Sequence, residues 1–267
     1  GDVYKRQLFV DYIIFAKKER MESLKQRRTI RKYQQKDISA DLLNDLLETS
    51  FRASTVGNMQ VYSVIVTRDA ERKAKLAPAH FNQPMVTQAP CVITVCADVH
   101  RFSMWCEQRD AEPCYDNFAW FLNGVTDALL AAQNLCVEAE AHGLGICYLG
   151  TTIYTAEEIA RILDLPKGVI PVTTIVVGHP DESPELTDRL PLDAVVHCEK
   201  YRHYTSSEID ELWAEKETSE ETRRLLEENG LPNLAQIFTR NRYRAEDNLA
   251  ISRNYFALLK KQGFFNN

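Results

Sequence analysis

The chain has 267 residues, of which 45% are hydrophobic and 26% are charged, a composition typical of globular proteins with one large domain or two small ones. Its 32 Lys and Arg residues against 38 Asp and Glu residues give a net charge of −6, which argues against broad binding of nucleic acid. Seven cysteines without C-x-x-C spacing argue against a disulfide framework and favour a reducing cytoplasm.

The first twenty residues read differently from the rest of the chain. Residues 8–16 (LFVDYIIFA) are apolar, but they include Asp11 and are far shorter than the roughly 20 residues of a membrane helix. A small-residue cleavage site is missing, so a secretory signal fits badly. A sequence that makes sense as a domain start begins after Met21. We therefore predict that residues 1–20 are an N-terminal extension or an artefact, and that the protein has no membrane partner.

The next hundred residues mix helices and strands. Ser39 is the expected N-cap of a helix whose leucines recur at helical spacing. A continuous apolar run at 91–97 predicts a strand that is buried on both faces. The predicted elements are, in order, a basic segment RRTIRKY at 27–33, a helix after Ser39, a polar loop STVGNMQ at 54–60, a strand at 61–67, a helix at 69–77 and the strand at 91–97.

A long helix dominates the second half of the pattern. Residues 117–142 are apolar on most faces, which predicts burial in a core or at a subunit interface, and Gly143 is a natural C-cap. The elements that follow are a strand at 145–151, a helix at 156–165, a strand at 169–180, a loop at 181–191, a polar helical segment at 206–229, a basic loop at 239–244 and a last helix near 245–262.

This mixture favours an α/β or α+β sandwich followed by a mainly charged arm. We predict a core domain at 21–200 and a C-terminal helical arm at 201–267.

A search for nucleotide and hydrolase motifs finds none. Gly143 and Gly145 lack the third glycine of a dinucleotide turn, and they lie between a helix and a strand, the reverse of the Rossmann order. P-loop, zinc-protease and nucleophile-elbow signatures are also absent. The six histidines are scattered, so we predict no metal site. A Cys–His nucleophilic pair has no local signature, but it stays open because such partners meet only in the fold.

Four other motifs are specific as a set, in their order along the chain. They are RRTIRKY at 27–33, STVGNMQ at 54–60, GLG with YLGT at 143–145 and 148–151, and RLP at 189–191. Over roughly 21–265 they resemble the FMN-dependent nitroreductase family, and in particular its oxygen-insensitive NADPH nitroreductase branch.

The resemblance implies a fold, an assembly and a reaction. The fold would be an α+β, nitroreductase-like three-layer α/β/α sandwich with a central antiparallel sheet, built as a domain-swapped homodimer with FMN at the interface. NADPH or NADH would pass hydride to N5 of FMN in a ping-pong reaction, and a nitroaromatic, quinone or flavin would then take the electrons. Because the cofactor performs the chemistry, no catalytic side chain is predicted.

The family's cofactor contacts can be carried over residue by residue. Arginine forks suit a phosphate group, and a nearby cation suits the charge that a reduced flavin gains. The matching FMN-binding positions are Arg27, Arg28, Thr29, Arg31, Ser54, Thr55, Asn58, Gln60, Gln83, Tyr148, Leu149, Gly150, Thr151 and Arg189, of which Asn58 and Gln60 would act across the dimer interface. As a separate hypothesis, Arg240, Arg242 and Arg244 bind the phosphate of NADPH.

The chain departs from the family pattern at three positions. Thr29 replaces the usual Ser, Thr187 stands where some relatives have Lys, and Thr151 replaces a second Gly. Several motifs also have simpler interpretations. The basic segment 27–33 could be a solvated lead-in to a helix, the polar loop 54–60 a plain turn and 239–244 a solvated loop, while Arg189 could pair with a neighbouring acid.

Other functions also remain open at this point. They are a flavin reductase or a specific flavin-dependent dehydrogenase of the same fold, and a flavin-binding or nucleic-acid-binding module without enzymatic activity.

Overall fold

The computed structural model describes residues 24–265, so the predicted extension at 1–20 lies outside the described residues. The chain divides into two compact units. The first contains the chain up to Glu185 and again from Arg253, and the second is Leu186–Ser252. The predicted domain boundary at residue 200 falls inside the second unit.

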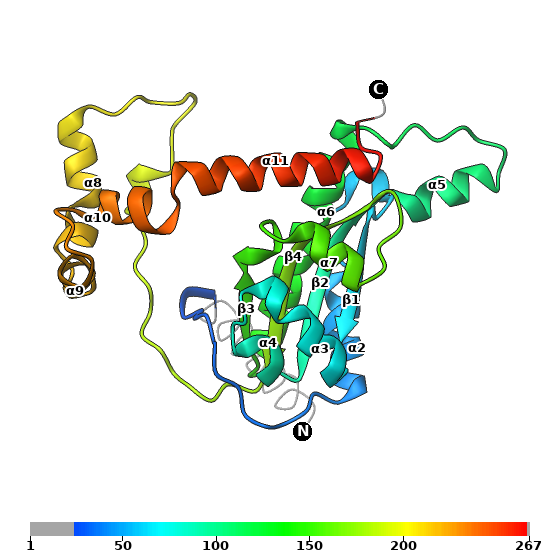
Figure 1. The fold of residues 1–267 in the computed structure, drawn as a ribbon, viewed down its shortest axis with the longest axis horizontal. Coiled ribbons are helices and arrows are strands. Elements are labelled where there is room, and N and C mark those ends of the chain that lie inside the picture. The colour runs from blue at the N-terminus through cyan, green and yellow to red at the C-terminus, as the bar shows by residue number, and fades with distance from the viewer. Residues whose placement is uncertain (1–23, 266–267) are drawn as a thin grey trace, which may run out of the picture. The chain divides into compact units, whose positions relative to one another are not determined.

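A four-stranded antiparallel sheet forms the centre of the first unit (Figure 1). Its strand order is β1-β2-β4-β3, so β1 and β3 are the two edges. Every residue of the two central strands is buried, as the continuous apolar run at 91–97 predicts for the first of them. The strands are β1 (Tyr62–Thr67), β2 (Cys91–Asp98), β3 (Gly145–Leu149) and β4 (Val169–Gly178).

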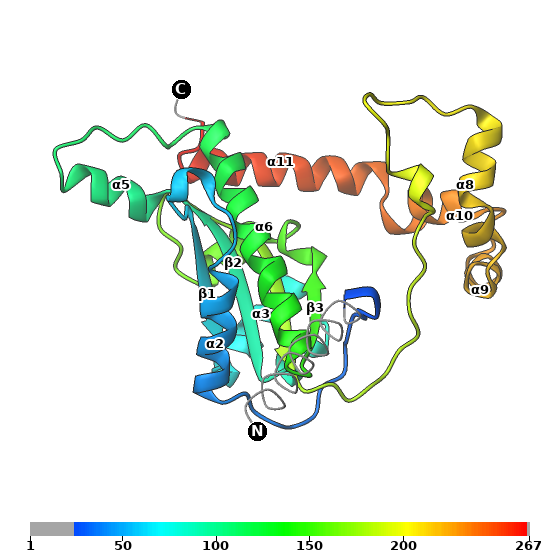
Figure 2. The same ribbon diagram turned by 180° about the vertical axis from the view of Figure 1, so that it is seen from behind.

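Helices cover both faces of this sheet. Figure 2 shows α2 and α6 on one face, and Figure 1 shows α3, α4 and α7 on the other. Each face has its own apolar core, with Leu46 and Leu135 in one and Leu76 and Ile159 in the other. The predicted three-layer α+β sandwich is therefore confirmed. The helices are α2 (Ala40–Ser50), α3 (Ala70–Leu76), α4 (Met85–Gln88), α5 (His100–Glu107), α6 (Phe118–Ala141) and α7 (Ala156–Ile162).

Local signals account for most of these boundaries. The Ser39 hydroxyl accepts a hydrogen bond from the Leu42 N–H at 3.2 Å and caps α2, as predicted. Gly143 takes φ +72° just after α6, where a residue with a side chain would be strained. Helix α5 was not predicted, because Cys106 is its only buried residue and no apolar stripe marks it.

The second unit is mainly helical, as the predicted helical segment 206–229 indicates, and one prediction fails there. The predicted helical segment 206–229 is two helices, because Ser219 adopts an extended conformation and caps the second one. The predicted loop at 239–244 is wrong for 239–242, which belong to a turn of π-helix. The elements are α8 (Ser206–Thr218), α9 (Glu220–Asn229), α10 (Leu234–Gln236), η5 (Ile237–Arg242) and α11 (Ala245–Lys261), which continues past Arg253.

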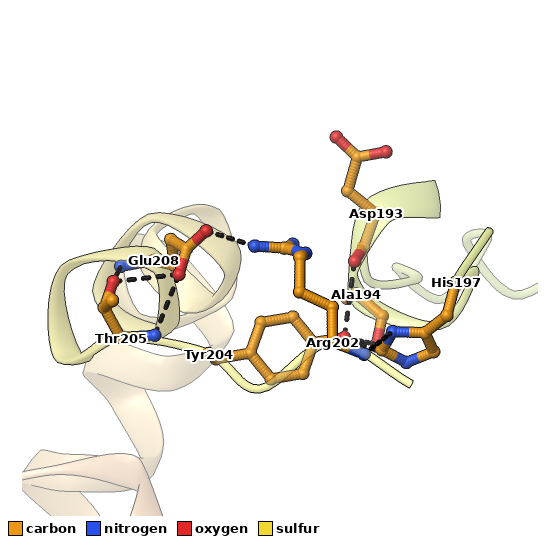
Figure 3. Close-up of polar contacts among 7 residues, drawn as sticks. All are labelled: Asp193, Ala194, His197, Arg202, Tyr204, Thr205 and Glu208. Carbon is orange, nitrogen blue, oxygen red and sulfur yellow. Dashed lines mark hydrogen bonds and ion pairs between the residues drawn. The ribbon is translucent and has the colours of Figure 1, made fainter. Parts of the chain in front are cut away.

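Local polar contacts organise the start of α8 (Figure 3). Thr205 and Glu208 form a reciprocal capping box, and Arg202 pairs with the Glu208 carboxylate. The Tyr204 hydroxyl donates to the Ala194 carbonyl at 3.0 Å. These contacts tie the segment before α8 to the helix itself.

Among residues 24–265, no helix has both the length and the hydropathy that crossing a bilayer requires.

Candidate functional site

The basic segment 27–33 lies along the edge strand β3. Thr29 forms a parallel bridge with Ile146, and the Ile30 N–H donates to the Ile146 carbonyl at 2.9 Å. The Tyr33 hydroxyl then donates back to the Ile30 carbonyl at 2.6 Å. These bonds extend the sheet by a short piece of backbone and cover an edge that would otherwise be unpaired. The position of the segment is thus set by its backbone.

Arg31 and Lys32 are also held through their backbone, which leaves their basic side chains available for a ligand. The N–H groups of Arg31 and Lys32 both donate to Glu182 Oε1, at 2.5 and 3.1 Å, while the two side chains are exposed. Arg28 is half-buried; its Nη1 donates to the Gln26 carbonyl at 3.2 Å, and its buried Nε has no hydrogen-bond partner among residues 24–265. Buried donors are normally satisfied, so this guanidinium is suited to an anion.

Arg27 has an acidic neighbour on α6. Its Nε lies 3.7 Å from Glu140 Oε1. Burial raises the pKa of the Glu140 carboxyl to about 7, and the Arg27 charge acts in the opposite direction. Arg27 is therefore partly compensated already, whereas Arg28, Arg31 and Lys32 carry the remaining positive charge of the segment.

A glycine allows the segment to approach β3 this closely. A Cβ on Gly145 would lie 2.6 Å from Ile30 Cγ1, whereas a Cβ on Gly150 would meet nothing within 4 Å. We expect Gly145→Ala to destabilise the protein by about 1–3 kcal/mol, because Ile30 and the backbone bonded to Ile146 must move. Gly150→Ala should change stability by less than about 0.5 kcal/mol. Urea unfolding of the two variants measures the difference, and equal losses would contradict this account.

The far end of β3 carries the YLGT motif. Leu149 and Thr151 are buried, Tyr148 is half-buried and Gly150 is exposed at the start of the turn η3 (Gly150–Thr152). The Thr151 hydroxyl lies 2.9 Å from Nδ1 of His80. The backbone at Gly150 is therefore accessible, and its flanking residues are held in the core.

His80 was not among the predicted site residues, although it contacts one of them. It is fully buried, and its Nε2 has no partner within the described chain. Burial lowers its pKa from 6.5 to about 4, so the ring is neutral at pH 7. No sequence signal marks a lone histidine as the partner of a threonine 71 positions away.

The turn after His80 brings Gln83 to the same region. Phe81 and Asn82 both have positive φ, 56° and 54°, a conformation that costs energy in residues with side chains. The Gln83 N–H donates to the His80 carbonyl at 3.1 Å. The predicted residues Gln83 and Thr151 therefore both contact His80, Gln83 through its backbone N–H and Thr151 through its hydroxyl.

The buried histidine predicts a pH-dependent stability. The unfolded ring, with a pKa near 6.5, takes up a proton well before the folded ring does at about 4. The free energy of unfolding should therefore fall as the pH drops from about 6.5 to 4, by up to about 3 kcal/mol from this group. Urea titrations at pH 7 and pH 4.5 should show that the free energy of unfolding falls less for His80→Gln than for the unmodified protein. Identical losses would rule His80 out as the cause.

The polar loop 54–60 lies at the opposite edge of the sheet, before β1. Its ends are held by Asp127 of α6, which accepts from the Val56 N–H at 3.0 Å and the Val61 N–H at 3.2 Å. Gly57, Asn58 and Gln60 in this loop all have positive φ. Ser54 and Thr55 precede the short turn η1 (Val56–Asn58).

The two halves of the predicted site are thus separated within one chain. Strands β2 and β4 lie between the edges β1 and β3. Three strand spacings of about 4.8 Å correspond to about 14 Å, so the loop 54–60 and the segment 27–33 do not meet within this chain.

Comparison with known proteins identifies the fold family. Residues 24–179 match the model of the nitroreductase family, which is more than half of the chain. The chain belongs to the nitroreductase family. A relative from Bacillus subtilis (strain 168), named FMN reductase (NADPH), is 32% identical over 183 residues, covering 68% of this chain and 74% of the relative. An NADPH-dependent oxidoreductase of Staphylococcus aureus is 35% identical over 182 residues, covering 67% and 72%.

Solved structures agree with this assignment. A crystal structure from Bacteroides fragilis NCTC 9343 is 55% identical, with a TM-score of 0.90 over 91% of this chain and 99% of that one. A nitroreductase of B. subtilis is 27% identical, with a TM-score of 0.82 over 93% and 100% of the two chains. The predicted family is confirmed.

The match to the nitroreductase model ends before Arg189. In the second unit, Arg189 Nη1 donates to the Thr187 hydroxyl at 2.8 Å and to the Asp188 carbonyl at 2.7 Å. The Asp188 carboxylate is paired instead with Lys216, at 2.7 Å. Arg189 therefore donates hydrogen bonds to the hydroxyl of Thr187 and the carbonyl of Asp188, and it forms no ion pair with the Asp188 carboxylate.

The three arginines of the segment 239–244 in this nitroreductase have separate surroundings. Arg244 forms a two-pronged pair with Asp247, at 2.7 and 3.0 Å. The guanidinium of Arg242 lies 5.5 Å from the centre of the Phe238 ring, and Arg240 is exposed. Arg240 and Arg242 are the better candidates for a phosphate, because the charge of Arg244 is already matched.

Proposed function

We propose that this nitroreductase is an FMN-dependent NAD(P)H oxidoreductase. The observation that carries the proposal is the arginine segment fixed on the edge of β3, where Arg28 holds a buried and unpaired Nε. The names of the relatives, an FMN reductase (NADPH) and an NADPH-dependent oxidoreductase, support the same cofactor and electron donor.

The described residues fit a flavin phosphate and ring. Arg28 and Arg31 would hold the phosphate, with Arg27 and Thr29 beside them. The ring would lie against the exposed backbone at Gly150, with its polar edge toward Gln83 and with Tyr148, Leu149 and Thr151 supporting that backbone. When bound, FMN supplies reversible two-electron chemistry between a reduced nicotinamide and a nitroaromatic, a quinone or a free flavin.

We infer that the complete site requires a second copy of the chain. Residues Ser54, Thr55, Asn58 and Gln60 lie at the edge opposite the arginine segment, so a partner would supply them. Helix α6 leaves Leu122, Leu129 and Leu130 between 44% and 48% exposed, and such side chains on one helix are suited to a subunit interface.

In such a dimer the predicted arm at 201–267 would exchange only through its residues before Arg253, because Leu258, Leu259 and Phe264 pack in the core of their own chain. All seven cysteines are free thiols, in keeping with a reducing cytoplasm.

The cheapest test is the colour of the purified protein. We expect a yellow protein with flavin absorbance that bleaches on addition of NADPH. A colourless protein that does not take up added FMN would contradict the proposal. Steady-state rates with free FMN, a quinone and a nitrofuran, each with NADPH and NADH, then separate a flavin reductase from a broad nitroreductase.

A further inference from the structure

Three side chains that can bind metals, none of them among the residues proposed for the flavin, converge between α2 and the end of α6. Glu138 and His142 are one turn apart near the end of α6, and Asp45 reaches them from α2. One nitrogen or oxygen from each lies within 4.8 Å of the other two. His142 Nε2 is 3.3 Å from Glu138 Oε1 and 3.6 Å from Asp45 Oδ2.

These distances fit an ion better than direct pairing. A hydrogen bond between an imidazolium and a carboxylate is about 2.7–2.9 Å long, and both observed distances exceed this. A single Nε2–H can also point toward only one of the two carboxylates. In a tetrahedral zinc site with bonds of about 2.0–2.1 Å, neighbouring ligand atoms lie about 3.3–3.4 Å apart, which is close to the two distances from His142 Nε2.

The surroundings favour a cation and leave room for it to enter. Two carboxylates supply negative charge, and the carbonyl end of α6, which ends at Ala141, adds the partial negative charge of a helix C-terminus. Glu138 is 10% exposed, whereas His142 and Asp45 are 38% and 60% exposed. The site therefore has a buried base and an open side where water can complete the coordination.

We propose that Asp45, Glu138 and His142 form a site for a divalent transition metal, with Zn²⁺ as the fitting ion. One imidazole and two carboxylates suit Zn²⁺ better than Mg²⁺, which rarely takes nitrogen ligands. The ion would join α2 to the end of α6. The absence of a metal was predicted from the scattered histidines, and this proposal departs from that prediction because the third ligand comes from another helix.

The test is a zinc titration of the full-length, chelator-treated protein followed by calorimetry. Exposed thiols also bind zinc, so the background is Cys114→Ser with Cys198→Ser. We expect one equivalent per chain with a micromolar dissociation constant, and a melting temperature that rises by a few degrees. Mg²⁺ at the same concentrations should give neither effect.

Two variants and one control decide the outcome. His142→Gln and Asp45→Asn should each weaken Zn²⁺ binding by about tenfold or more, and Asp45→Asn changes an exposed position and should leave the fold intact. His203→Gln, at an exposed histidine of the second unit, should bind as the background protein does.

The visible spectrum of bound Co²⁺ gives a second readout, which should be tetrahedral in the background protein and lost in both variants. The proposal would be overturned if Zn²⁺ did not bind stoichiometrically, if Mg²⁺ bound with equal strength, or if all three variants had equal affinities for Zn²⁺. These readouts do not depend on flavin or on activity, so the flavin proposal stands or falls separately.

Discussion

Replacing both Arg28 and Arg31 by alanine is expected to weaken FMN binding by at least about a hundredfold while the fold survives. A hydrogen bond to a charged group contributes about 1.5–3 kcal/mol, so two lost phosphate contacts amount to about 3–6 kcal/mol. The fold should survive because the bonds from Ile30 and Tyr33 that hold the segment use backbone and the Tyr33 hydroxyl. Fluorescence titration of the apoprotein with FMN measures the affinity.

Lys32→Ala is the matched control within the same segment. Its side chain is exposed, so the variant should lose less than about threefold in affinity through long-range charge alone. If Lys32→Ala weakens FMN binding as much as the double variant does, the effect is one of net charge and the assigned contacts are wrong. Unchanged FMN retention in the double variant would remove Arg28 and Arg31 from the site.

Replacing Asp127 by alanine is expected to lower the free energy of unfolding by about 3 kcal/mol. The carboxylate is 2% exposed and accepts from two N–H groups at the ends of the loop 54–60, which would be left unpaired. Each such loss costs about 1–3 kcal/mol. Burial raises the pKa of Asp127 while the bonds from Val56 and Val61 lower it, so the net effect is below the sum of two ideal bonds. Urea unfolding measures the loss.

The same change should also act on the cofactor site. With its ends released, the loop would present Asn58 and Gln60 less often in the required positive-φ conformation, so FMN affinity should fall about tenfold. Thr126→Ala, one position away and exposed, should affect neither stability nor affinity beyond about 0.5 kcal/mol. A stable Asp127→Ala protein would show that the two backbone bonds matter little.

Much of the fold could be predicted from local patterns. The cap at Ser39, the apolar runs of β2 and β4 and the long apolar helix α6 all appear where periodicity and composition place them. Helix α5, the break at Ser219 and the π-helical turn at 237–242 were missed. In these places the apolar signal is weak and a few hydrogen bonds decide the conformation, which propensities do not resolve.

The family motifs similarly named the parts of the site but not its geometry. The segments 27–33 and 148–151 were recognised by their residues, and the structure brings both to β3. His80 and Asp127 belong to no short motif. Each contacts a residue more than sixty positions away in the chain, so no local pattern marks it.

The sequence by itself determined the class of fold, the family and the basic segment of this nitroreductase, because these depend on local periodicity and on short motifs. Only the tertiary structure decided that the loop 54–60 and the arginine segment lie on opposite edges of the sheet. It also decided that Asp45 meets Glu138 and His142. Such contacts depend on strand order and helix packing, which arise from burial of the whole core and are encoded in no single stretch of residues.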